Sequence, residues 1–160
     1  MPDWSTTIFR AIVIGLMTYI ALTLTDIKLA HAEDAAIGDS IALGTGRALH
    51  VPTYAAVGKG SCDILKFMSR RHFDHVVISA GINDPPGACV TLIRSEVNAD
   101  RVTWILPAPI NSARKHIALV ALLHGDQYVT YDCPGGCSRR SFHPSSYAVV
   151  ARAVRETWSR

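Results

Sequence analysis

Short apolar runs alternate with longer segments of helical periodicity from residue 35 to the end of the chain. The apolar runs predict strands at residues 35–38, 51–57, 75–80, 101–106 and 127–131. Apolar positions three or four residues apart predict helices at residues 41–49, 61–69, 88–97, 112–123 and 144–158. Pro144 suits the first turn of the last helix, where a missing backbone N–H costs nothing. Because strands and helices alternate, we predict a three-layer α/β/α sandwich with a flavodoxin-like, five-stranded parallel sheet in the order 2-1-3-4-5.

The first 32 residues have the three-part layout of a secretory signal peptide. A polar start containing Arg10 precedes an apolar stretch at residues 11–24, and Ala30 and Ala32 supply the small residues of a cleavage site. This apolar stretch is nearer the roughly 10–14 residues of a signal core than the roughly 20 of a membrane span, although an uncleaved anchor is the alternative. We therefore predict a signal peptide at residues 1–32 and one exported domain, periplasmic or secreted, at residues 33–160. No stable membrane span is expected after cleavage.

Charge and composition do not favour a nucleic-acid partner. The 160-residue chain carries a formal net charge of +3, and its basic residues are scattered rather than gathered in a stripe. No internal repeat or linker divides residues 33–160, which are enough for one domain with a core of its own. The sequence leaves the oligomeric state open.

All four cysteines lie in the part predicted to be exported, where an even number indicates disulfides. Cys133 and Cys137 can close a small loop around a turn, which leaves Cys62 to pair with Cys89. Three pairings are possible in principle, and the sequence does not choose among them. A zinc site is less favoured, because a single C-x3-C lacks a second pair at ligand spacing.

Residues suited to acyl transfer follow the predicted strands, at the edge where parallel α/β sheets bind their ligands. Such chemistry requires a hydroxyl nucleophile, an imidazole base and donors for an oxyanion. The segments that supply these residue types are Gly38-Asp39-Ser40, Gly58-Lys59-Gly60-Ser61, Gly81-Ile82-Asn83-Asp84 and Ser141-Phe142-His143-Pro144.

In these segments the chain resembles the SGNH hydrolases, also called GDSL esterases. The family's blocks are G-D-S, a glycine after the second strand, G-x-N-D, and D-x-x-H-P followed by a tyrosine and a helix. The matching residues are Gly38-Asp39-Ser40, Gly58 or Gly60, Gly81-Ile82-Asn83-Asp84, and His143-Pro144 with Tyr147. Each block alone is a weak signal, but the four occur in the family's order over nearly all of residues 33–160.

The resemblance implies a serine esterase that works through an acyl-serine intermediate. Ser40 would be the nucleophile, and His143 would be the general base and then the general acid. The backbone N–H groups of Ser40 and Gly58, with Gly60 as the alternative to Gly58, and the side-chain amide of Asn83 would form the oxyanion hole. The resemblance implies neither a metal nor an organic cofactor.

One position departs from the family pattern. The aspartate expected three residues before His143 is replaced by Arg140, and the nearest upstream acidic residue is Asp132. That aspartate normally orients the imidazole and stabilises its charged form. Asp132 is therefore the candidate orienting acid, a backbone carbonyl acting in a Ser-His dyad is the second possibility, and an impaired site is the third.

Each candidate also has a purely structural interpretation. Ser40 can serve as a helix N-cap, Asn83 as part of a turn, and His143 as an ordinary loop histidine. Asp39 and Asp84 are interpreted mainly as turn and capping groups. The occurrence of serine, asparagine and histidine together at one edge of the sheet favours a catalytic site.

The sequence thus predicts an exported esterase acting on a small acyl ester or an acylated glycan, such as an acetylated envelope polysaccharide. Two alternatives remain open at this point. One is a non-catalytic binding domain on the same scaffold, favoured by the missing aspartate. The other is an acyltransferase that passes the acyl group to a sugar hydroxyl.

Overall fold

The computed structural model describes residues 33–84, 89–137 and 142–160. The predicted signal peptide, its cleavage site and Arg140 lie outside these residues. The strands are β1 (Ala35–Gly38), β2 (Thr53–Ala55), β3 (Phe73–Ser79), β4 (Ala99–Ile105) and β5 (Gln127–Val129). They form one sheet in the order β2-β1-β3-β4-β5, and every neighbouring pair is parallel. The predicted fold class and strand order are therefore confirmed.

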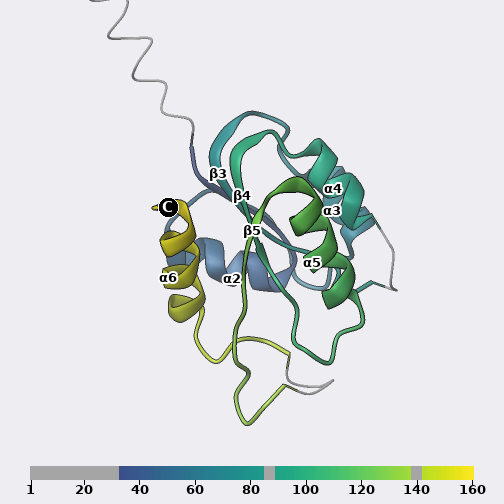
Figure 1. The fold of residues 1–160 in the computed structure, drawn as a ribbon, viewed down its shortest axis with the longest axis vertical. Helices are drawn as coiled ribbons and strands as arrows, with labels where there is room; N and C mark the ends of the chain where they lie inside the picture. Colours follow the sequence, from purple (N-terminus) through teal and green to yellow (C-terminus); the bar gives the residue numbers. More distant parts are fainter. Residues whose placement is uncertain (1–32, 85–88, 138–141) are drawn as a thin grey trace, which may run out of the picture. The chain divides into compact units, whose positions relative to one another are not determined.

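Helices cover both faces of this sheet (Figure 1). They are α2 (Ser40–Leu49), α3 (Ser61–Phe67), α4 (Val90–Glu96), α5 (Ala113–His124) and α6 (Tyr147–Trp158). Helices α2 and α6 pack together on one face, and α3, α4 and α5 lie on the other. The sheet is thus the middle layer of a three-layer sandwich.

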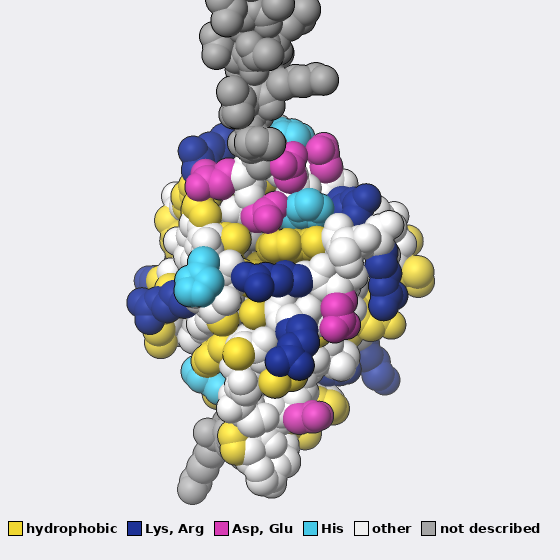
Figure 2. All heavy atoms as spheres, turned by 90° about the vertical axis from the view of Figure 1, so that its left-hand side faces the viewer, with side chains coloured by type: hydrophobic (Ala, Val, Ile, Leu, Met, Phe, Trp, Pro, Cys, Tyr) yellow, Lys and Arg dark blue, Asp and Glu magenta, His cyan; other side chains and the backbone are white. Residues whose placement is uncertain are grey.

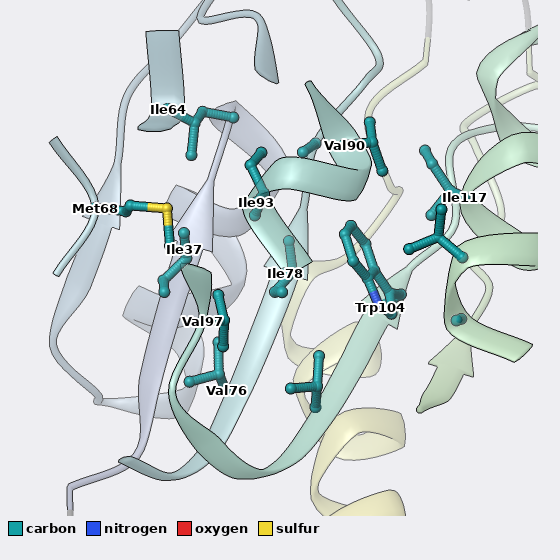
Figure 3. Close-up of a cluster of buried hydrophobic side chains, with 14 of the residues drawn as sticks. Ile37, Ile64, Met68, Val76, Ile78, Val90, Ile93, Val97, Trp104 and Ile117 are labelled. Atoms are coloured by element: carbon teal, nitrogen blue, oxygen red, sulfur yellow. The ribbon is translucent and has the colours of Figure 1, made fainter. Parts of the chain in front are cut away.

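Successive strand residues face opposite layers, because side chains alternate along a strand. In β3, Val76 and Ile78 belong to the core under α3, α4 and α5, whereas Val77 belongs to the core under α2 and α6. Trp104 is fully buried in the first core, on the side of the cluster nearest Ile117 (Figure 3). Its indole N–H donates to the Asp126 carboxylate, which also pairs with the Arg94 guanidinium. Both faces of the central strands are therefore apolar, which accounts for their continuous apolar runs.

The last helix begins three residues later than predicted, at Tyr147. The Ser145 N–H and hydroxyl both donate to the Asp132 carbonyl oxygen, and Ser146 has an extended backbone. These bonds hold the segment after His143 against the end of β5, so Pro144 precedes the helix instead of opening it. The prediction for Pro144 was therefore wrong.

The four cysteines form two disulfides, as their even number indicates, and the structure settles the pairing that the sequence left open. Cys62 pairs with Cys89, and Cys133 pairs with Cys137. The first connects the start of α3 to the residue before α4, and the second closes a four-residue span after β5. Disulfides persist in oxidising compartments, so the two pairs are consistent with an exported protein.

Charged and apolar side chains are interspersed over the face shown in Figure 2, with most of the acidic groups toward the top of the view and Lys and Arg mostly across its middle. None of the helices in the described ranges combines the length and the apolar character needed to cross a bilayer.

Candidate active site

The turn from β1 into α2 places Ser40 at the carboxyl edge of the sheet. Gly38 ends β1 with φ +142°, and a Cβ there would lie 1.8 Å from the Ser79 carbonyl oxygen of β3. Only glycine fits so close to the neighbouring strand in this backbone conformation. Asp39 follows in an extended conformation, and its Oδ1 accepts from the Ile41 N–H at 2.9 Å. Asp39 is therefore the N-cap of α2, as the sequence predicts for a capping group.

Ser40 is the first residue of α2 and does not cap it. Its hydroxyl instead lies 3.1 Å from His143 Nε2, across 103 residues of sequence. Ser40 is buried, whereas His143 is exposed to solvent. An imidazole can activate a serine through a hydrogen bond of this kind.

The loop that carries His143 is fixed to the segment after β5 by hydrogen bonds to main-chain carbonyl oxygens. The Tyr131 hydroxyl donates to the Phe142 carbonyl oxygen at 2.7 Å, and Ser145 donates twice to the Asp132 carbonyl oxygen. The Phe142 and His143 rings also meet edge to face, with centroids 4.9 Å apart. His143 is thus positioned from both sides by residues that follow β5.

The second ring nitrogen of His143 faces a tyrosine. The Tyr147 hydroxyl lies 3.4 Å from His143 Nδ1. Tyr147 is the first residue of α6, and its ring packs on Gly44 of α2. A Cβ at Gly44 would lie only 2.4 to 2.6 Å from three ring carbons of Tyr147. The absence of a side chain at Gly44 is what lets the tyrosine ring lie there.

Asp132 meets the His143 loop through its main chain. Its side chain is exposed, and its carbonyl oxygen is the acceptor for Ser145. Within residues 33–84, 89–137 and 142–160, His143 forms no ion pair with a carboxylate.

The candidate oxyanion donors lie on two loops that are joined to each other. The Asn83 side-chain amide donates to the Lys59 carbonyl oxygen at 3.1 Å, beside Gly58. Gly58 has φ +71° and is exposed, whereas Gly60 is the N-cap of α3. The Asp84 carboxylate accepts from the Ser61 N–H at 2.6 Å, so Asp84 is a capping group as predicted. Asn83 and Gly58 therefore lie together, and the hydrogen bonds of the described residues do not join them directly to Ser40.

Burial strongly perturbs the acid beside Ser40. Asp39 is fully buried, and one of its oxygens, Oδ2, has no hydrogen-bond partner among the described residues. Loss of hydration raises the pKa of Asp39 to about 7, against the lowering effect of the Ile41 N–H. Burial raises the pKa of Tyr131 to about 12, and burial together with the charge of Asp39 also raises the pKa of Tyr147. Both phenols therefore stay neutral at ordinary pH.

A groove of about 570 Å³ opens beside α5. Asn111 is one of its lining residues, and the Asn111 side chain donates to the Ile82 carbonyl oxygen, next to Asn83. The other lining residues are Pro109, Ile110, Ser112, Arg114, Lys115 and Ala118. In the part of the chain that the structure describes, no three histidine, cysteine or acidic side chains cluster as metal ligands would.

Sequence reasoning identified Ser40 and His143, which the structure brings together. It noted Tyr147 only as part of a motif and assigned it no role. The available signal was its spacing, four residues after His143.

Comparisons with known proteins give one structural likeness. No protein-family model matches this chain, and neither does any curated protein sequence. A crystal structure of a Bacteroides fragilis protein that has been proposed to be an acylhydrolase is similar in fold, at 16% identity and a TM-score of 0.48. The match covers 84% of this chain and 94% of that one.

Proposed function

We propose that this protein is an exported serine hydrolase that cleaves a small acyl ester through an acyl-serine intermediate. The observation that carries the proposal is the 3.1 Å contact between Ser40 Oγ and His143 Nε2. Since Asp39 already caps α2, this hydroxyl is left free for chemistry. The proposal includes an esterase of the SGNH type, which the resemblance of the four sequence blocks supports.

In the acylation step, Ser40 Oγ attacks the ester carbonyl carbon while its proton moves to His143 Nε2. The carbonyl oxygen takes up the negative charge of the tetrahedral intermediate. His143 then gives the proton to the leaving alkoxide, the C–O bond of the ester breaks, and the alcohol departs. In the deacylation step, water repeats the attack with His143 again as base, and a carboxylic acid and free Ser40 result.

The backbone of α2 offers one donor for the oxyanion. Ser40 is the first residue of that helix, so its N–H has no carbonyl partner four residues earlier within the helix. The positive end of the helix dipole adds to this favourable field. Gly58 and Asn83 are the proposed further donors, and Asn83 would exchange its bond to the Lys59 carbonyl for one to the substrate. Each such donor is typically worth about 10²–10³ in turnover.

The setting of the site favours a small or surface-presented substrate. His143 is solvent-exposed beside the buried Ser40, so the ester can approach from an open side. The predicted signal peptide and the two disulfides support export. An acetyl ester on an envelope glycan is the substrate class we propose to test first.

The test compares labelling by a fluorophosphonate probe and hydrolysis of p-nitrophenyl acetate for wild type, Ser40→Ala and Ser61→Ala. Ser61 is a matched control, because it too is a buried serine that opens a helix after a strand. We expect Ser40→Ala to abolish both signals and Ser61→Ala to keep them. Labelling that survives in Ser40→Ala would exclude Ser40 as the nucleophile. Failure of the folded wild type to react would favour the binding domain instead.

A further inference from the structure

We propose that Tyr147 is the positioning residue for His143 and takes the place at Nδ1 that an aspartate occupies in a conventional triad. The inference rests on the proposed function, because it assigns His143 the role of base. Three contacts carry it: those of Tyr147 with His143, of His143 with Ser40, and of Tyr147 with Gly44.

These contacts close a ring of residues. Ser40 and Gly44 are four residues apart on α2, so they lie on the same face of that helix. The Tyr147 ring covers Gly44, the Tyr147 hydroxyl reaches His143 Nδ1, and His143 Nε2 returns to Ser40. The helix that carries the nucleophile therefore also places the residue that orients the base.

The protonation requirements of the reaction define what Tyr147 does. For Nε2 to accept the Ser40 proton, the neutral imidazole must carry its own proton on Nδ1, from which it donates to the Tyr147 oxygen. A distance of 3.4 Å is long for this bond in the free protein, and such bonds often tighten when the reaction begins. The imidazolium then donates through both ring nitrogens.

A phenol is a weaker partner for this purpose than a carboxylate. Tyr147 stays neutral, because burial and the nearby Asp39 both oppose its ionisation. A neutral hydroxyl can also donate to Nδ1, so it fixes the ring orientation more firmly than it fixes the tautomer. We therefore infer a site with intact geometry and modest turnover.

The experiment compares Tyr147→Phe, Asp132→Asn and the control Tyr128→Phe, which makes the same change at an exposed residue of β5. Phenylalanine keeps the ring over Gly44 and removes only the hydroxyl. We expect Tyr147→Phe to lower kcat about tenfold with KM unchanged, and the other two variants to change kcat less than twofold.

A second readout does not depend on activity. The ¹⁵N shifts of the His143 ring nitrogens should change in Tyr147→Phe and stay as in wild type in Asp132→Asn and Tyr128→Phe. Unchanged His143 shifts in a folded Tyr147→Phe variant, or the same change in Asp132→Asn, would overturn the inference. If the wild type shows no turnover, the proposed function fails, and the nitrogen shifts still decide whether Tyr147 holds His143.

Discussion

Replacing Asp39 by asparagine tests the electrostatics of the site independently of its activity. Asparagine can keep the capping bond, since its Oδ1 can still accept from the Ile41 N–H. What it removes is an ionisable group with no access to solvent. The two proteins therefore differ in charge at this position only when Asp39 is ionised.

The magnitude follows from the pKa of Asp39, which burial raises from 3.8 to about 7. The folded protein keeps this proton up to about pH 7, whereas the unfolded chain releases it near pH 4. The contribution of Asp39 to stability is therefore most favourable below about pH 4 and is lost as the pH rises to about 7. At about 1.36 kcal/mol per tenfold change in proton affinity, the loss is about 4 kcal/mol.

Urea unfolding monitored by far-ultraviolet circular dichroism, from pH 4 to pH 8, measures the effect. Groups that titrate equally in both proteins cancel in the difference between Asp39→Asn and wild type. We expect little difference at pH 4 and a variant more stable by up to about 4 kcal/mol at pH 8. A control, Asp63→Asn, changes an exposed acid whose pKa is lowered by Lys66, so its small effect should have the opposite sign. A flat difference between Asp39→Asn and wild type across this range would refute the reasoning.

Three further predictions test the packing around the site. Gly38→Ala should destabilise the fold by about 2 kcal/mol or more in urea unfolding, because the new Cβ meets the Ser79 carbonyl in a strained backbone; unchanged stability would contradict that geometry. Gly44→Ala should displace the Tyr147 ring and lower kcat at least as far as Tyr147→Phe does, measured with p-nitrophenyl acetate; unchanged kcat would mean that the ring does not need this space. Replacing both Cys62 and Cys89 by serine should cost about 3.5 kcal/mol of unfolding free energy, since the disulfide spans 27 residues; a loss below about 1 kcal/mol would show that the loop is already restricted without it.

The sequence was sufficient for the topology because the two periodicities differ so clearly. Runs such as residues 75–80 are apolar on both faces, which only a central strand of a covered parallel sheet requires. The predicted ends of the helices and strands were less accurate than their order. The strand predicted at residues 51–57 extends only from Thr53 to Ala55, between Pro52 and the exposed Val57.

Part of the site also depends on where each helix begins and on contacts between residues far apart in the sequence, which no local sequence pattern reveals. Asp39 and Ser40 are both good capping residues, so the sequence did not decide which of them is free. That choice depends on a one-residue difference in where α2 begins. The position of Tyr147 depends on Gly44, more than a hundred residues earlier, and on the bonds of Ser145 that delay the start of α6.

Because the His143 loop is attached to the segment after β5, heating should disrupt the Ser40–His143 contact before it unfolds the core. β5 is three residues long, lies at the edge of the sheet and pairs only with β4. Such a strand can open locally at a lower free energy than the central strands, while the rest of the chain stays folded. Tyr131 and Asp132, which hold the His143 loop, would move with it. His143 would then move away from Ser40 before the core unfolds, so the proposed activity should be lost at a lower temperature than the fold itself.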